Sequence, residues 1–594
     1  MWCSMDSFRK AAALAVLAAL TFIIYSNTLH GPFILDDGMY IVKNQQIKDL
    51  SLLWPPSPRY LTYLSFAFNY SLGGLDTFGY HLFNVAVHIV NSALVFAIAL
   101  LLFRTNGLKD KGLEGYALPV AVMASFFFAA HPVQTQAVSY ITQRFASLTA
   151  LFYLLSIACY LKWRTSGSKG RAVFYGVALL CTIAAQLTKE TGFTLPAVIV
   201  LLEFAFFKGA ALPGKRLLAL VPFILVMLIV PLLLFAPGLF SAGSSGLSEA
   251  TRLQQLRDLE TISRHDYMAT ELRVMVTYFR LLVLPVGQNL DYDYPLLTSF
   301  FAPQVLLSSF LVIGVFGLGL YLLGRGMKGR GPLKLVAGFG VLFFFMAISI
   351  ESSIIPINDV IYEHRLYLPS AGAALFFSAM LMGLFEFLKK RFALRGSALA
   401  WAIVAVVVLA GPLAAATCSR NNLWKDDFLL WQDVAAKSPD KARVRNNLGN
   451  AFYRKGLKAE GLSEFKRAVE LDPSFPDAHF NLGNAYKDLG LMEEAVKEYE
   501  KAVELEPGKL NARNNLGLAY FTVGRYAEAV EQFETILARN PNDFRARNNL
   551  GLAYSAMGRL DLAEEEFRAA ISIKPDFADA LNNLRLIDMK KGRE

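Results

Sequence analysis

Charged residues are scarce in this sequence, since Asp, Glu, Lys and Arg make up only 18% of its 594 residues. A soluble domain typically has about 25%. Cysteine is scarcer still: there are four, and no two of them form a C-x-x-C pair. These shortages exclude a secreted disulfide scaffold and a disordered polar chain, and they disfavour a zinc site. With 55% hydrophobic residues, the chain cannot be one large soluble enzyme either.

The positive charge is unevenly distributed along the chain. The formal net charge of +10 first suggests a nucleic-acid binder. However, residues 1–419 carry a net charge of +11 and residues 420–594 carry −1. The basic excess therefore belongs to the apolar part of the chain, and a nucleic-acid partner is disfavoured.

Long apolar runs fill the first 417 residues. A membrane-spanning helix needs about 20 mostly apolar residues, and the sequence contains about eleven candidates. The first run follows Arg9 and Lys10 and is not followed by a small-residue cleavage site, so we expect an uncleaved anchor. We predict a polytopic membrane domain over residues 1–417, with spans centred near residues 18, 92, 124, 153, 179, 200, 226, 314, 342, 377 and 407.

The loops between these runs alternate in charge. Five short loops are rich in Lys and Arg, near residues 104–111, 162–171, 208–216, 325–334 and 389–395. Basic loops stay in the cytoplasm, so we expect a cytoplasmic N-terminus. The longer, more acidic loops would then face outside, at about residues 27–79, 131–144, 188–193, 237–303 and 351–366. An odd number of spans places the C-terminal domain outside as well. The short basic turns favour a bacterial inner membrane with that domain in the periplasm.

The C-terminal part repeats every 34 residues. Five prolines keep this step, at positions 439, 473, 507, 541 and 575, and four Leu-Gly pairs keep it too. This period is typical of tetratricopeptide repeats, whose stacked helix pairs form a concave groove. We predict a helical connector over residues 418–441 and a repeat domain over 442–594, with four full repeats and a capping helix. The predicted fold class is therefore all-α throughout, a membrane helical bundle followed by an α-solenoid.

One asparagine recurs at the same phase on the first helix of each repeat. A side-chain amide carries both a donor and an acceptor, which suits the backbone of an extended peptide. These asparagines could thus bind an acceptor peptide, or they could bridge adjacent helices of the array. The residues are Asn447, Asn481, Asn515 and Asn549, with Asn583 in the cap.

Two adjacent carboxylates follow the first span. Asp36 and Asp37 lie about ten residues beyond its end, beside an apolar stretch. A carboxylate in this position can act as a general base toward a hydroxyl, or it can hold a divalent cation. Asp291 and Asp293 are also spaced like a metal-binding pair, but a turn before Pro295 explains them adequately. A divalent cation is therefore a candidate cofactor with no assigned ligands.

The long first loop, followed by an amphipathic segment at residues 59–69, resembles the GT-C class of membrane glycosyltransferases. Together with the repeat array, several motifs resemble the transmembrane and tetratricopeptide-repeat-containing O-mannosyltransferase family. They are Phe33-Ile34-Leu35-Asp36-Asp37, Arg59-Tyr60-Leu61-Thr62, Gly79-Tyr80-His81-Leu82-Phe83-Asn84, His131-Pro132-Val133-Gln134-Thr135-Gln136-Ala137-Val138, Lys189-Glu190-Thr191-Gly192, Leu284-Pro285-Val286-Gly287-Gln288-Asn289-Leu290-Asp291-Tyr292-Asp293 and Glu363-His364-Arg365-Leu366-Tyr367-Leu368-Pro369-Ser370.

The resemblance implies a GT-C-like bundle that transfers a sugar from a polyprenyl-phosphate donor to a hydroxyl, with inversion. Mannose or another hexose on Ser or Thr of an extracytoplasmic protein is the expected product. Asp36 or Asp37 would be the base, and the repeat groove would dock the acceptor. The lipid-linked sugar is then a co-substrate, and membrane lipid surrounds the bundle.

A leaving phosphate needs cationic donors, and arginine suits it through its forked guanidinium. We expect Arg365, His364, Lys189 and Arg144, at the outer ends of spans, to bind it. Salt bridges are the alternative, between Lys189 and Glu190 and between Arg365 and Glu363. The loop at 237–303 has a flexible start and an amphipathic body, which suit either a lid or interfacial packing.

A non-enzymatic scaffold for envelope assembly is the rival function, in which the repeat groove rather than the aspartates is essential. A transporter ranks last, because few charges fall within the spans and no internal symmetry is evident.

Overall fold

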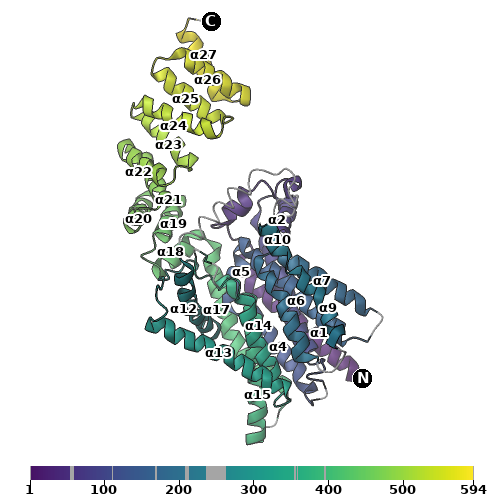
Figure 1. The fold of residues 1–594 in the computed structure, drawn as a ribbon. Helices are drawn as coiled ribbons and strands as arrows, with labels where there is room; N and C mark the ends of the chain where they lie inside the picture. Colours follow the sequence, from purple (N-terminus) through teal and green to yellow (C-terminus); the bar gives the residue numbers. More distant parts are fainter. Residues whose placement is uncertain are drawn as a thin grey trace. The chain divides into compact units, whose positions relative to one another are not determined.

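The computed structural model describes residues 2–53, 59–109, 111–167, 170–207, 213–235, 262–352, 356–357, 359–393 and 396–592. Over these residues the chain forms helices and turns and no strand, as predicted (Figure 1). Two compact units divide it, Met1–Leu429 and Leu430–Glu594. The division falls inside the stretch that the sequence suggested as a connector.

Apolar helices lie at the predicted span positions of the first unit. Their bounds are α1 (Trp2–Tyr25), α3 (Thr77–Leu102), α4 (Glu114–Ala130), α6 (Arg144–Thr165), α7 (Arg171–Gln186), α8 (Leu195–Phe206), α9 (Pro213–Val226), α10 (Ile229–Phe235), α13 (Pro303–Met327), α14 (Leu333–Ile348), α15 (Pro369–Phe392), α16 (Ala398–Ala405) and α17 (Gly411–Asn421). Within the described residues, six helical stretches are long and apolar enough to cross a membrane, or seven if one bent pair counts as a span. The predicted count of about eleven is not confirmed.

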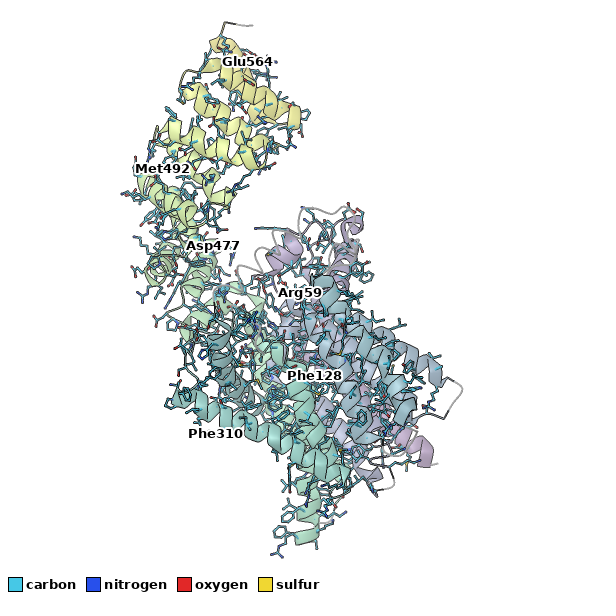
Figure 2. All side chains as sticks on the ribbon, in the orientation of Figure 1. Arg59, Phe128, Phe310, Asp477, Met492 and Glu564 are labelled. Carbon is cyan, nitrogen blue, oxygen red and sulfur yellow. The ribbon has the colours of Figure 1, made fainter. Side chains whose placement is uncertain are left out.

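The outward faces of this unit are apolar. Phe128 is 1% exposed among the helices of the bundle, whereas Phe310 on α13 is 74% exposed (Figure 2). Leu307 and Ile313 on the same helix are similarly exposed. Soluble proteins rarely expose apolar surface of this extent to water, whereas a helix surrounded by lipid does so at no cost. The helices therefore fit a membrane protein.

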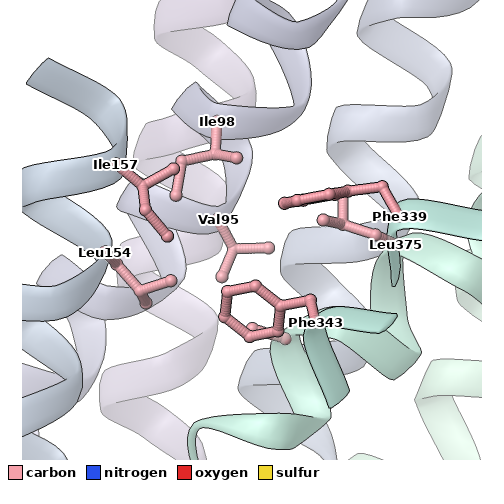
Figure 3. A pocket seen from close by; sticks show the side chains of 8 residues that line it. Val95, Ile98, Leu154, Ile157, Phe339, Phe343 and Leu375 are labelled. Carbon is pink, nitrogen blue, oxygen red and sulfur yellow. The ribbon is translucent and has the colours of Figure 1, made fainter. Parts of the chain in front are cut away.

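Small residues allow close contact inside the bundle. A Cβ added to Gly340 on α14 would lie 2.5 Å from the carbonyl oxygen of Gly372 on α15, so only glycine fits there. Such small-residue contacts are typical of helices packed in membranes. A cavity of only about 10 Å³ remains between Val95, Leu154 and Phe343, from three neighbouring helices (Figure 3).

Two proline positions break the regular helices. Pro132 follows the end of α4, where His131 Nδ1 accepts a hydrogen bond from the backbone N–H of Val133. The chain bends by 51° there and continues as η4 (Pro132–Gln134) and the short helix α5 (Thr135–Ser139). Further on, Pro412 lacks the N–H that a regular helix needs, and the π-turn η9 (Val406–Ala410) precedes it.

The segments outside these helices contain short elements. They are η1 (Ser26–Thr28), η2 (Gly38–Val42), η3 (Leu50–Leu53), α2 (Tyr60–Gly73), η5 (Ile141–Gln143), η6 (Glu190–Thr194), α12 (Arg264–Val283), η8 (Glu363–Leu366) and η10 (Asn422–Lys425). Of the predicted lid, residues 237–261 lie outside the described residues. Its apolar portion belongs to α12, whose Tyr267, Val274 and Tyr278 are buried.

The second unit is a stack of helix pairs. After α18 (Asp427–Lys437) come α19 (Ala442–Arg454), α20 (Lys458–Leu471), α21 (Pro476–Asp488), α22 (Met492–Leu505), α23 (Leu510–Thr522), α24 (Tyr526–Arg539), α25 (Phe544–Ala556), α26 (Leu560–Ile573) and α27 (Ala578–Lys590). The repeated Leu-Gly pairs have a steric cause. A Cβ on Gly517 would lie 2.7 Å from the Phe533 ring, and Gly483 approaches Tyr499 equally closely. Glycine thus lets the two helices of each repeat touch.

Candidate active site

The two aspartates of the first loop differ sharply in their surroundings. Asp36 is exposed, whereas Asp37 is 1% exposed. Asp37 accepts hydrogen bonds from the backbone N–H of Ile34 at 2.9 Å and of Thr142 at 2.8 Å, and from the Thr142 hydroxyl. Asp37 therefore ties the first loop to the turn at residues 141–143, directly before α6, while the neighbouring Asp36 is exposed.

Burial also changes the acid–base behaviour of Asp37. It raises the pKa of this carboxyl to about 7, and the hydrogen bonds from Thr142 and Ile34 oppose the rise. Leu35, two residues before Asp37, has a left-handed backbone conformation with φ of 49°. Such a conformation is costly for a non-glycine residue and often marks a functional turn. The buried aspartate and this turn together fix where Asp36 lies.

Tyr140 connects the aspartates to a second group of motif residues. Its hydroxyl oxygen accepts the backbone N–H of Asp36 at 2.9 Å. Burial raises the pKa of Tyr140 well above its usual value, and the nearby Asp36, Asp37 and Tyr362 raise it further. The ring of Tyr362 in turn stacks on His364 at 5.1 Å. The Asp36 turn and η8 therefore share one neighbourhood.

Three cations act on His364. Burial lowers the pKa of this imidazole well below its usual value, and the positive charges of Lys189, Arg365 and Arg59 lower it further. The imidazole is therefore neutral at pH 7. Arg59, Lys189, His364 and Arg365 are called the basic cluster below.

Two members of the basic cluster, Arg59 and Lys189, have acidic partners, and Arg59 remains partly accessible. Arg59 Nε lies 3.2 Å from Glu190, and 28% of the Arg59 side chain is exposed. Like Leu35, Arg59 is a non-glycine residue in the left-handed region, with φ of 69°. Lys189 Nζ pairs with the Glu351 carboxylate. The alternative pairing of Lys189 with Glu190 thus does not occur, because Glu190 pairs with Arg59.

His364 has an unsatisfied nitrogen. Its backbone N–H donates to Gln136 Oε1 at 2.7 Å, which links η8 to the broken helix at α5. Its Nδ1 is buried and has no hydrogen-bond partner among the described residues, and neither has Gln136 Nε2. Buried polar groups are seldom left unpaired, so these two atoms are available to a ligand.

Arg365 is enclosed by protein oxygens. Its Nη2 donates to the carbonyl of Asp359 at 2.6 Å and its Nη1 to that of Val360 at 2.9 Å. Its guanidinium also lies 3.7 Å from Glu271, whose pKa burial raises to about 7. The predicted alternative partner, Glu363, instead pairs with Arg420 at 2.9 Å.

Arg144 is the most enclosed of the four predicted phosphate ligands. It is 0% exposed, and each of its three nitrogens donates to a protein oxygen. Nε bonds Asn84 and Nη1 bonds Asn69, both at 2.7 Å, and the guanidinium lies over the Phe83 ring at 4.3 Å. In this arrangement Arg144 joins α2, α3 and α6, and a phosphate could reach it only by displacing these partners.

An apolar groove lies between helices of the first unit. It has a volume of about 590 Å³ and runs between α8, α9, α13 and α14. Pro196, at the start of α8, lies seven residues after Lys189, and Met346, near the end of α14, lies five residues before Glu351. Two residues of the groove lining are thus close along the chain to the Lys189–Glu351 pair. Its lining is Pro196, Ala197, Val200, Leu201, Phe204, Ile224, Met227, Phe316, Leu320, Leu342 and Met346.

Metal-ligand groups are absent from the part of the chain that the structure describes, where no three His, Cys, Asp or Glu side chains gather. Asp291, of the predicted metal-binding pair, is 4% exposed in the segment after α12. The nearby Gln288 Nε2 donates to the Glu363 carboxylate, so this motif is joined to η8.

The asparagine ladder bridges neighbouring repeats. Asn481 Nδ2 donates to Asn446 Oδ1 at 2.8 Å, and Asn515 Nδ2 donates to Asn484 Oδ1 at 2.9 Å. Asn549 and Asn583 donate in the same way as Asn481, to the asparagine 35 residues earlier. This is the bridging role that the sequence left open beside peptide binding. The bonds occupy one amide hydrogen of each donor, so a role for Asn447, Asn481, Asn515 and Asn549 toward an acceptor stays a prediction.

Sequence reasoning missed several residues of this site. Tyr140, Glu351 and Glu271 lie outside the quoted motifs, and only the fold brings them to the basic cluster. Arg59 and Gln136 stand within motifs but received no role. Arg59 carried a usable signal, because it is the single arginine in a loop predicted to face outside.

Comparison with known families finds tetratricopeptide repeats in the second unit. The tetratricopeptide repeat model matches residues 430–474 and 514–578, and a second TPR repeat model matches 460–490 and 483–524. The protein O-mannosyl-transferase F38B6.6 of Caenorhabditis elegans is 26% identical over 488 residues, 78% of this chain and 63% of that protein. The protein O-mannosyl-transferase TMTC3 of Homo sapiens is 25% identical over 78% of this chain and 52% of its own length.

This chain is a homologue of the TMTC-family protein O-mannosyl-transferases. The resemblance inferred from the motifs is thereby confirmed. The chain spans between about half and just under two thirds of these full-length relatives. Among solved structures, the MamA 41-end structure from Desulfovibrio magneticus RS-1 is 26% identical, with a TM-score of 0.25, over 26% of this chain and 86% of that one.

Proposed function

We propose that this protein transfers a sugar, most simply mannose, from a polyprenyl-phosphate donor to a serine or threonine hydroxyl of a protein. The observation that carries this proposal is the joint placement of an exposed carboxylate, Asp36, and the basic cluster in a homologue of protein O-mannosyl-transferases. The positive-inside pattern favours an extracytoplasmic reaction, with the bacterial inner membrane and periplasm as the proposed setting.

In this proposal Asp36 is the general base and Asp37 holds it in place. Asp36 accepts the proton of the acceptor hydroxyl while that oxygen attacks the anomeric carbon. The bond from the anomeric carbon to the phosphate oxygen breaks, and polyprenyl phosphate leaves with the bonding electrons. One displacement of this kind inverts the anomeric centre. Exposure selects Asp36 over Asp37, because Asp36 is exposed and Asp37 is 1% exposed.

The basic cluster would receive the leaving phosphate. Arg59 and Lys189 supply positive charge, and His364 supplies an unpaired Nδ1. Transition-state charge on the leaving oxygen is stabilised by donors that are already in place. Arg365 and Arg144 are bonded to protein oxygens, so we assign them to support of the neighbouring segments rather than to direct phosphate contact.

The apolar groove supports a lipid-linked donor. A ligand with an anionic head at Lys189 and a long apolar tail along α8 and α14 would use both the positive charge and the apolar lining. Burying each methylene of such a tail contributes about 0.8 kcal/mol. A free nucleotide sugar would leave the groove without an occupant.

The test is transfer in reconstituted vesicles. The protein receives polyprenyl-phosphate mannose carrying a radiolabel, together with a serine- and threonine-containing peptide, and labelled peptide is counted. We expect transfer from the lipid donor and none from a nucleotide sugar, with the opposite anomeric configuration in the product. Folded protein that transfers no sugar from lipid-linked mannose or another lipid-linked hexose would refute the proposal.

A further inference from the structure

The outer end of the last membrane helix contacts both halves of the candidate site. This junction segment, residues 417–425, includes the end of α17 and η10, and α18 begins two residues later. Thr417 Oγ1 donates to the carbonyl of Ala130 at 2.7 Å, directly before the break at Pro132. The segment is therefore anchored at the broken helix that presents Gln136 to His364.

The first loop is held from the same segment. Trp424 is 1% exposed, and its ring lies 5.8 Å from that of Tyr140, the residue whose hydroxyl accepts the Asp36 amide. The carbonyl oxygen of Trp424 would lie 2.8 Å from a Cβ at Gly31, so the loop passes directly against it. Asn421 adds two bonds, donating to the carbonyl of Ile24 at 3.0 Å and accepting from Ser139 at 3.1 Å.

The turn that carries His364 is held by Arg420. Its guanidinium lies 2.9 Å from the Glu363 carboxylate, and the two side chains are 9% and 0% exposed. Glu363 also accepts the backbone N–H of Asn289 at 2.8 Å and the hydroxyl of Tyr292 at 2.7 Å. A buried carboxylate with four donors fixes its backbone firmly, and His364 is the next residue along that backbone.

We propose that Trp424 and Arg420 are positioning residues that set the separation between Asp36 and the basic cluster. Trp424 acts through Tyr140 on Asp36, and Arg420 acts through Glu363 on His364. Neither side chain is assigned to the reacting atoms. The junction segment would thereby hold the two halves of the catalytic site in place. This inference rests on the proposed function, because the two groups must face one substrate for their separation to matter.

The experiment compares two variants of the full chain in lipid nanodiscs with two matched controls. Trp424→Leu removes the ring against Tyr140, and Arg420→Lys keeps the charge but loses the forked geometry. The controls are Trp401→Leu, a tryptophan stacked on Phe385 at 5.4 Å, and Arg216→Lys, from an ion pair with Glu203 at 2.9 Å. Each variant is measured for kcat, for KM of donor and acceptor, and for amide hydrogen exchange.

We expect Trp424→Leu to lower kcat about tenfold with acceptor KM unchanged, because misplacement of a reacting group by about 1 Å can cost up to 100-fold. Exchange should accelerate over residues 31–42. Trp424→Phe, which keeps a ring, should restore both. Arg420→Lys should raise donor KM and accelerate exchange over residues 363–366. The two controls should change neither region.

The inference is overturned if Trp424→Leu and Arg420→Lys match their controls in exchange, or if exchange accelerates while kcat and KM stay at wild-type values. If wild-type protein transfers no sugar, the proposed function fails and catalytic positioning fails with it. The exchange data then still report whether the junction segment holds residues 31–42. Should Trp424→Leu not fold, the comparison of Arg420→Lys with Arg216→Lys decides in its place.

Discussion

Replacing Thr142 by valine should move the pH dependence of sugar transfer. Asp37 has a pKa raised to about 7 by burial, and the Thr142 hydroxyl is one of three donors that oppose the rise. In the proposed mechanism the ionised form of Asp37 accepts all three bonds and holds Asp36 in place. Activity should therefore rise with pH through about 7, as Asp37 loses its proton.

The magnitude follows from the lost hydrogen bond. A hydrogen bond to a charged group contributes about 1.5–3 kcal/mol, and 1.36 kcal/mol corresponds to one pH unit. Thr142→Val leaves the backbone donors of Ile34 and Thr142 in place, so we expect the rise to move upward by about one pH unit or more. The sign is fixed, because loss of a donor to the carboxylate favours its protonated form.

The assay is kcat/KM for transfer between pH 5.5 and 9, in vesicles of constant composition. Thr149→Val is the matched control, since Thr149 is equally buried on α6 and donates to the carbonyl of Phe145 at 2.7 Å. Its profile should match that of the wild type. An unmoved profile in Thr142→Val, or an equal movement in Thr149→Val, would refute the assignment of the titrating group to Asp37.

Three further predictions concern the groove and the repeats. Val200→Trp should raise KM for a long-chain donor several-fold but leave a short-chain donor unaffected, whereas the exposed Val173→Trp should change neither. Gly517→Ala should destabilise the repeat unit by about 1–3 kcal/mol through overpacking on Phe533. The measurement is the temperature at which proteolysis of residues 430–594 begins, which should fall. An unchanged temperature would mean that the Phe533 ring simply moves aside. Asn515→Ala should cost about 1 kcal/mol in the same assay, and an unchanged onset would remove its bridging role.

The periodic parts of this fold could be predicted from the sequence. Helices occur at the predicted span positions because long apolar runs have few alternatives in lipid. The repeat helices follow the 34-residue step because each glycine of the Leu-Gly pairs meets an aromatic ring. The count of spans could not be predicted as well, because composition alone does not show whether a short apolar helix such as α8 crosses a bilayer.

The candidate site could be predicted only in part. The motifs identified Asp36, Asp37, Lys189 and His364 as candidate site residues. The sequence alone could not show which of the two adjacent aspartates is the base. Burial separates them, and burial of Asp37 depends on Thr142, more than a hundred residues away. The alternative ion pairs, Lys189 with Glu190 and Arg365 with Glu363, do not form for the same reason.

Long-range partners also explain what was missed. Lys189 pairs with Glu351 and Glu363 pairs with Arg420, and neither partner is close in sequence. Adjacent charges such as Lys189 and Glu190 often point to different neighbours, so proximity along the chain predicted the pairing poorly.

The central claim, that Asp36 is the base and Asp37 its support, is tested most directly by comparing Asp36→Asn with Asp37→Asn in the same transfer assay at pH 8. Asp76→Asn is the control, since Asp76 lies in the same loop and caps α3 through the backbone N–H of Phe78, a role that asparagine keeps. General-base catalysis contributes about 10²–10⁴-fold. We expect the transfer rate to fall by that factor in Asp36→Asn, to fall less in Asp37→Asn and to stay at the wild-type value in Asp76→Asn. Near-wild-type transfer by Asp36→Asn would contradict the central claim.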